Sequence, residues 1–165
     1  MTFELPLDQL RDLFGDHLHE NVVMANYTTA HVGGPAAALI PVNSSLELEK
    51  AARSLWKLKI PFRIIGSGAN ILFSDRGYPG VILVNHAHTI KIDSHSTPPV
   101  VWAESGANLG SIAHQTALRG LRGLEWAATI PGTLGGALYG NAGAQAFDIA
   151  STLASVDILQ PDGSK

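Results

Sequence analysis

Residues 120–143 read Gly-Leu-Arg-Gly-Leu-Glu-Trp-Ala-Ala-Thr-Ile-Pro-Gly-Thr-Leu-Gly-Gly-Ala-Leu-Tyr-Gly-Asn-Ala-Gly and hold seven of the chain's 17 glycines. Glycine lets the main chain approach a ligand closely and adopt positive φ, at an entropic cost that a plain connector has no reason to bear. Successive bare N–H groups form an anion-binding concavity, particularly where residues 135–138 open a helical turn. The stretch therefore predicts a ligand-lining segment. A tightly packed helix–loop crossing, with glycines for clearance, is the alternative.

A second glycine-rich loop, Gly-Ser-Gly-Ala-Asn-Ile-Leu at residues 66–72, follows a short predicted strand at residues 62–65. It resembles the start of a dinucleotide fingerprint, but Ile71 stands where the third glycine belongs and a turn follows at residues 74–80 instead of a long helix. A Rossmann unit is therefore excluded. A phosphate cradle is not, because small residues with exposed N–H groups suit a pyrophosphate. The alternative is a strand-ending turn capped by Asn70.

The residues before this loop predict a β-α-β unit. A short leading helix spans residues 6–14, with Gly15 as its stop, and a turn-rich segment leads into an apolar strand at residues 37–42. Ser-Ser-Leu-Glu at residues 44–47 is a capping box that opens an amphipathic helix, which Pro61 ends. The strand at residues 62–65 completes the unit, and residues 81–84 form another buried strand.

After residue 85 the pattern changes to that of an antiparallel lobe. Strands at residues 90–93 and 100–104 flank a polar turn, and a helix capped by Asn108 ends at Gly120. Alternation predicts one more strand at residues 152–159. Asp162-Gly163 is a hairpin turn without its returning strand, so we expect a fragment of a longer protein.

The expected fold class is α+β in two lobes, the first β-α-β and the second a mainly antiparallel sheet with helices. Residues 1–25 form the leading helix and linker, 26–86 the first lobe and 87–165 the second, incomplete lobe.

Composition excludes several classes of function. A formal net charge of −3, with 15% charged residues and scattered Lys and Arg, provides no basic surface for nucleic acid. No apolar run approaches the roughly 18 residues of a membrane span, and the amino terminus lacks a secretory signal, so a cytoplasmic location is compatible. There is no cysteine. His86 and His88 lack a third ligand nearby, so we expect no metal site.

Four motifs together resemble one family in the same order. They are Val-Gly-Gly-Pro-Ala at residues 32–36, the loop at 66–72, the block at 123–137 and Asn-Ala-Gly-Ala at 141–144. The family is UDP-N-acetylenolpyruvoylglucosamine reductase, a flavoenzyme of peptidoglycan precursor synthesis, and the resemblance covers nearly all of residues 28–165. It implies an FAD-binding module of the vanillyl-alcohol-oxidase/PCMH type, with non-covalent FAD between the two lobes.

The resemblance also implies site residues. Those that would cradle the FAD pyrophosphate through backbone N–H groups are Gly66, Ser67, Gly68, Ala69 and Asn70. Those that would line the flavin from the second lobe are Thr129, Ile130, Pro131, Gly132, Thr133, Gly135 and Gly136, with Asn141, Ala142 and Gly143 beside them.

In the family, NADPH reduces FAD, which then reduces the enolpyruvyl double bond of the UDP-sugar substrate, giving UDP-N-acetylmuramate. The family's catalytic arginine, serine and glutamate would lie beyond Lys165, so we assign no catalytic residue and expect no turnover by this chain alone. Two departures stand out: residues 145–148 read Gln-Ala-Phe-Asp where the family has an aromatic residue and Gly-Gly-Glu, and His31 replaces a commonly basic residue.

Two alternatives remain open. One is a non-catalytic flavin- or nucleotide-binding module. The other is a different flavin oxidoreductase of the same fold, in which a histidine attaches FAD covalently; the candidates are His31, His86, His88 and His114. The oligomeric state is not predicted.

Overall fold

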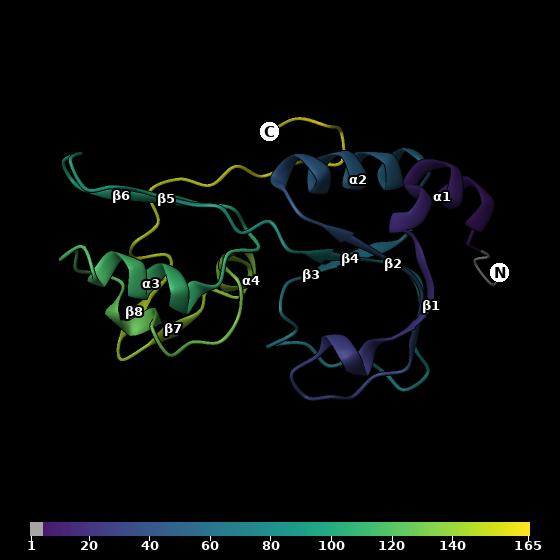
Figure 1. Ribbon diagram of the computed structural model, residues 1–165, viewed down its shortest axis with the longest axis horizontal. Helices are drawn as coiled ribbons and strands as arrows, with labels where there is room; N and C mark the ends of the chain where they lie inside the picture. Colours follow the sequence, from purple (N-terminus) through teal and green to yellow (C-terminus); the bar gives the residue numbers. More distant parts are fainter. Residues whose placement is uncertain (1–4) are drawn as a thin grey trace.

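The computed structural model describes residues 5–165, and residues 1–4 of the predicted leading segment lie outside the described part. Figure 1 shows two lobes side by side, the first built on a four-stranded sheet and the second on short helices and two-stranded sheets. The chain passes from the first lobe to the second directly after the last strand of the larger sheet.

The sheet of the first lobe has the strand order β1-β2-β4-β3. Its strands are β1 (His19–Val23), β2 (Pro35–Val42), β3 (Phe62–Ile65) and β4 (Tyr78–Asn85). Strands β2 and β3 both run parallel to β4, which lies between them, and β1 pairs antiparallel with β2. The sequence pattern missed β1, which falls within the range that we assigned to leading helix and linker. Its side chains are almost all exposed, so an apolar alternation is absent.

Two helices cover one face of this sheet: α1 (Leu7–Phe14) and α2 (Ser45–Lys57). Leu10 and Leu55 are fully buried there against strand residues such as Leu83. The other face packs Met24, from the 3₁₀ turn η2 (Met24–Tyr27), against Ile82 and its neighbours. Strand β4 is therefore buried on both faces, as expected for the interior strand of a covered parallel sheet.

The capping box predicted for α2 is confirmed. Ser44 Oγ accepts a hydrogen bond from the Glu47 backbone N–H at 3.2 Å, and Glu47 Oε2 accepts one from the Asn43 N–H at 2.8 Å. The first contact satisfies one of the N–H groups that the first turn of a helix otherwise leaves without a partner, and the second binds the N–H of Asn43, the residue before the N-cap.

Replacing Ser44 with alanine should therefore lower the free energy of unfolding by about 1 kcal/mol, the usual cost of losing an N-cap side chain. Urea denaturation followed by circular dichroism measures the change. Ser45→Ala is the matched control, since the Ser45 side chain makes no capping contact and the substitution keeps its backbone N–H. Equal losses in the two variants would contradict the capping role.

The second lobe is assembled from short elements. They are β5 (Ile90–Asp93), β6 (Val100–Ala103), α3 (Leu109–Ala117), η3 (Glu125–Ala127), α4 (Leu134–Tyr139), β7 (Gly143–Ala144) and β8 (Phe147–Asp148). Strands β5 and β6 pair antiparallel, as predicted. Strands β7 and β8, which the sequence did not predict, also pair antiparallel. Asn108 Oδ1 accepts from the Ser111 N–H at 2.8 Å and caps α3, also as predicted. A core containing Leu109, Trp126 and Ala137 joins the helices.

The strand predicted at residues 152–159 is wrong. This segment follows an extended but unpaired path along which Leu153, Val156 and Ile158 are exposed. Alternation gives a strand a face to bury only if another strand or helix lies beside it, and within residues 5–165 none pairs with this segment. Instead, the tail crosses back to the first lobe (Figure 1), where Lys165 forms an ion pair with Glu49 of α2.

Candidate functional site

The first predicted loop, residues 66–70, leaves the carboxyl end of β3. Gly68 has a φ of +69°, and a methyl group on it would overlap the backbone of Tyr27, so this position requires glycine. The Gly68 carbonyl accepts a hydrogen bond from the Thr29 N–H at 3.1 Å, which fixes the loop against the preceding segment. Among residues 5–165 no protein acceptor receives the backbone N–H groups of residues 67–70. The loop therefore presents a row of donors suited to a phosphate group.

The second predicted loop is fixed within its own lobe. Leu134 donates its N–H to the Ala107 carbonyl at 2.8 Å, and Gly135 donates to the Ser105 carbonyl at 2.7 Å. A methyl group on Gly135 would approach the Ser105 side chain and carbonyl to 2.9 Å, closer than side chains normally pack. Residues 105–107 thus act as the support on which this loop rests.

The two loops meet at the seam between the lobes. Gly66 lies so close to the Thr133 side chain that a methyl group on Gly66 would overlap it, and a methyl group on Gly132 would lie 3.8 Å from the Ala69 Cβ atom. Two segments more than 60 residues apart in the chain are therefore in direct van der Waals contact.

The third predicted group, residues 141–143, lies at the far end of α4. There the Asn141 Nδ2 donates to Asp148 Oδ2 at 3.1 Å, and the Ile149 N–H donates to the Ala142 carbonyl at 2.9 Å. In the part of the chain that the structure describes, these residues make no hydrogen bond to the first lobe. The structure thus brings together the loops at 66–70 and 132–133 but does not bring residues 141–143 to the same contact.

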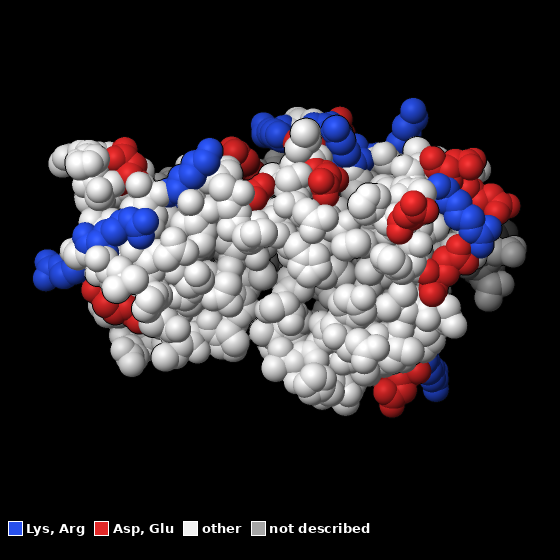
Figure 2. Space-filling view, viewed as in Figure 1, with Lys and Arg blue, Asp and Glu red and all other residues white. Residues whose placement is uncertain are grey.

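A pocket of about 410 Å³ adjoins the first loop. Its lining residues are Asn26, Tyr27, Thr28, Thr29, His31, Gly66, Ser67, Val84 and His86. Lys, Arg, Asp and Glu are absent from this lining, and the lower part of the seam is uncharged on the face shown in Figure 2. A bound anion would therefore meet no Lys or Arg side chain in this lining and would depend on backbone N–H groups and on hydroxyl, amide and imidazole donors.

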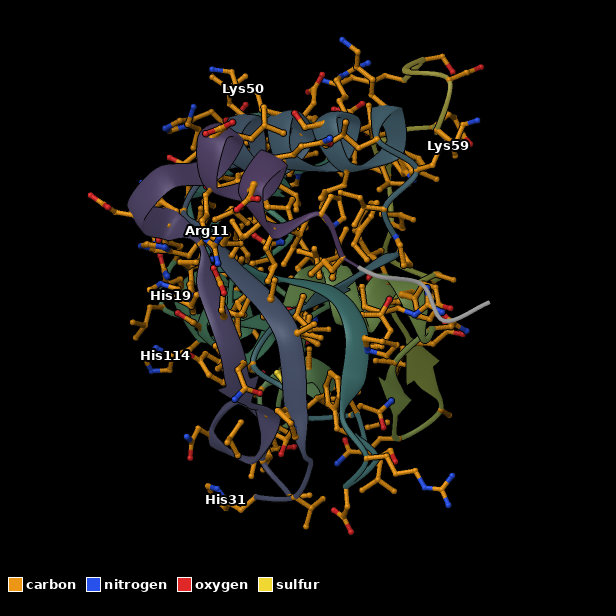
Figure 3. The ribbon with its side chains drawn as sticks, turned by 90° about the vertical axis from the view of Figure 1, so that its right-hand side faces the viewer. Arg11, His19, His31, Lys50, Lys59 and His114 are labelled. Carbon is orange, nitrogen blue, oxygen red and sulfur yellow. The ribbon has the colours of Figure 1, made fainter. Side chains whose placement is uncertain are left out.

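The pattern did not assign residues 26–30 to a site, and it named His31 and His86 only as candidates for covalent attachment of FAD. The signal that could have found them was the polar run Asn-Tyr-Thr-Thr at residues 26–29, three residues before the glycine pair Gly33-Gly34. Both glycines are required by close packing, because methyl groups on them would contact Phe73 and overlap the backbone of Asp75. In Figure 3 His31 lies at the lower end of the first lobe, opposite the end that carries α2.

The junction between the lobes contains a buried carboxylate. Glu104, 8% exposed, follows β6 and accepts hydrogen bonds from the Ser45 N–H at 2.7 Å and the Thr89 N–H at 2.9 Å. Burial acts to raise the pKa of this carboxyl group, but the bonds from Ser45 and Thr89 outweigh it and hold the pKa at about 2. The group is therefore ionised across the neutral range.

This lowered pKa has a defined effect on stability. Because the pKa of Glu104 is lower in the folded chain than its ordinary value of 4.5, its stabilisation is complete above that value and is lost as the pH falls toward 2. We expect the difference in free energy of unfolding between the wild type and Glu104→Gln to shrink across this window. Urea denaturation from about pH 6 down to about pH 3 measures it. A difference that stays constant with pH would contradict an ionised, hydrogen-bonded Glu104.

Residues 5–165 contain neither a metal-binding cluster nor a membrane-spanning helix. No group of three or more His, Cys, Asp or Glu side chains is placed to hold a metal ion. No described helix is both long enough and apolar enough to cross a membrane.

The two lobes and their joined loops define a class of protein by architecture, the two-lobed α+β FAD-binding domains. A family model described as an FAD binding domain matches residues 35–164, and the chain belongs to this family. Within it, the chain is a homologue of UDP-N-acetylenolpyruvoylglucosamine reductases. It is 38% identical to that of Prochlorococcus marinus over 88% of this chain, and 34% identical to that of Streptococcus uberis over 93%. The chain spans about half the length of these curated relatives, 50% in both cases.

Solved structures agree on the fold. The UDP-N-acetylenolpyruvylglucosamine reductase of Thermus caldophilus matches 78% of this chain and 44% of that chain, with a TM-score of 0.63 and 33% identity. An alkyldihydroxyacetonephosphate synthase matches 98% of this chain and 34% of that chain, with a TM-score of 0.69 at 16% identity, which shows the fold alone. The predicted fold class is confirmed.

Proposed function

We propose that this chain is the FAD-binding part of an NADPH-dependent reductase that converts UDP-N-acetylglucosamine enolpyruvate to UDP-N-acetylmuramate in the cytoplasm. The observation that carries the proposal is the contact between Gly66 and Thr133, which closes two glycine-rich loops on each other across the lobe seam. The similarity to reductases of this name supports the reaction. The UDP-sugar and NADPH would bind to the whole enzyme, and catalytic groups outside this chain would complete its active site.

The residues present fit the cofactor. The unbonded N–H groups of residues 67–70 would receive the pyrophosphate of FAD, with Gly68 keeping the loop close to Tyr27. Thr129, Ile130, Pro131, Gly132, Thr133, Gly135 and Gly136 would line the flavin, and residues 141–143 would extend that side. Bound FAD would supply hydride transfer. The chain itself would bind and orient the cofactor and shield it from water.

The test is flavin retention. Purified chain mixed with FAD and then desalted should keep a flavin absorption band, and titration of FAD with the apoprotein should quench flavin fluorescence at micromolar concentrations. Because backbone and neutral groups make the proposed site, the affinity should change little between low and moderate salt, where an ion-paired site would weaken. A chain that neither retains the flavin band nor quenches flavin fluorescence would contradict the proposal.

Covalent attachment is the second candidate, favoured by His31 and His86 in the pocket lining. We expect instead that acid precipitation releases the flavin into the supernatant. Flavin that stays with the precipitated wild-type chain and is lost from His31→Ala or His86→Ala would identify a covalent flavoprotein.

A further inference from the structure

We propose that Glu104 is a positioning residue that sets the two lobes, and hence the two glycine-rich loops, at a fixed separation. It lies in the second lobe, yet one of its carboxylate oxygens accepts the N–H of Ser45, the first residue of α2 in the first lobe. The other oxygen accepts the N–H of Thr89, where the chain enters the second lobe. One ionised group thus joins the end of a first-lobe helix to the second lobe and to the connection between them.

The lobes depend on such polar contacts because they share little apolar packing. Each of the three core clusters among residues 5–165 draws its buried side chains from one lobe alone. A second contact lies beside Glu104: the buried Asn85 side chain at the end of β4 donates to Ser105 Oγ at 2.8 Å and accepts from the Ala87 N–H at 3.0 Å. Interfaces with few apolar contacts permit relative motion unless specific bonds oppose it.

Only a few residues separate Glu104 from the cleft, by which we mean the contact between the loops at 66–70 and 132–133 together with the pocket beside it. Shortly after Glu104 in the chain, the Ser105 carbonyl accepts the N–H of Gly135 and the Ala107 carbonyl accepts the N–H of Leu134. These two hydrogen bonds fix the second loop. Thr133 of that loop packs on Gly66 of the first lobe. A shift of the residue 104–107 segment relative to α2 would therefore displace Thr133 from Gly66 and alter the site proposed for FAD.

The absence of cysteine makes the lobe separation directly measurable. Lys50 on α2 and His114 on α3 are exposed, and Figure 3 shows both side chains at the molecular surface. Nitroxide labels on Lys50→Cys and His114→Cys would report the interlobe distance by double electron–electron resonance. We expect one narrow distribution in the wild-type background. Glu104→Gln should broaden it, because its amide nitrogen would face an N–H donor, and should weaken FAD binding about tenfold.

Ser45→Pro provides an independent test if Glu104→Gln does not fold. It removes only the N–H that Glu104 accepts from α2, and proline is favoured at the first position of a helix. It should broaden the distribution in the same way. The matched control is Asp93→Asn, since Asp93 Oδ1 also accepts two backbone N–H groups, those of His95 and Ser96, but within one turn. That variant should leave the distribution unchanged.

The outcomes are separable. An unchanged distance distribution in folded Glu104→Gln or in Ser45→Pro overturns the positioning role. The effect on the cleft rests on the proposed function, but the distance measurement is made on the apoprotein. Broadened distributions in a chain that never binds FAD would therefore sustain Glu104 as the interlobe contact and refute the FAD proposal.

Discussion

Gly66→Ala should weaken flavin binding while the chain remains folded. The added methyl group would overlap the Thr133 side chain across the lobe seam, and neither partner can move freely, because Gly66 follows a paired strand and Thr133 precedes the bonded start of α4. Overpacking of this kind costs about 1–3 kcal/mol. If the lobes separate to relieve it, the dissociation constant for FAD should rise roughly ten- to 100-fold. Fluorescence titration with FAD measures the change.

Two variants test whether the overlap is the cause. Gly140→Ala adds the same methyl group to a glycine of the same stretch, where the nearest atom lies at an ordinary 3.5 Å and φ is −93°, so its affinity should equal that of the wild type. Thr133→Gly removes the obstructing side chain, and glycine is tolerated at a helix N-cap. The double variant Gly66→Ala/Thr133→Gly should bind FAD more tightly than Gly66→Ala alone. A double variant no better than the single one would locate the defect elsewhere.

The sequence predicted most of the regular elements because their signals are local. The capping box at Ser44, the Asn108 cap and the apolar run of β4 each depend on neighbours a few residues away, and each appears in the structure. The elements that the sequence failed to predict depend on neighbours that are distant in the chain. Strand β1 begins with three polar residues and is exposed at every position but Val22, and it exists because β2 offers it an edge. Residues 152–159 alternate correctly but have no strand beside them within the described residues, so the pattern alone could not make them a strand.

The candidate site shows the same division. Glycine density marked the loops at 66–70 and 132–136, and at Gly66 only glycine permits the close approach of the two loops. The contact between these loops depends on how the two lobes are arranged, which no local sequence pattern predicts. Glu104 was unpredictable for the same reason. Its partners at Ser45 and Thr89 are 59 and 15 residues away, and an isolated glutamate in a sequence is most often a solvated side chain.

Leu83→Ala should have the largest effect on folding. Leu83 is fully buried in β4, between Ile40 of β2 and Ile64 of β3, beneath the helices of the first lobe. Removing its side chain leaves a cavity, and such substitutions cost about 2–5 kcal/mol. Urea denaturation should show this loss, whereas Leu46→Ala, at a leucine that is 60% exposed, should stay within about 0.5 kcal/mol of the wild type.

FAD distinguishes this core role from a role in the cleft. A ligand that binds only the folded chain at 100 times its dissociation constant adds about 2.7 kcal/mol to the free energy of unfolding. Because Leu83 lies on the helix-covered face and not at the loop contact, FAD should stabilise Leu83→Ala and the wild type by equal amounts. Gly66→Ala should instead lose about half of that increment or more at the same FAD concentration, since a ten- to 100-fold weaker site retains only about 1.4 to 0.4 kcal/mol of it. If Leu83→Ala lost the increment as well, the sheet and the cleft would not be energetically separate, and the assignment of binding to the loops alone would be wrong.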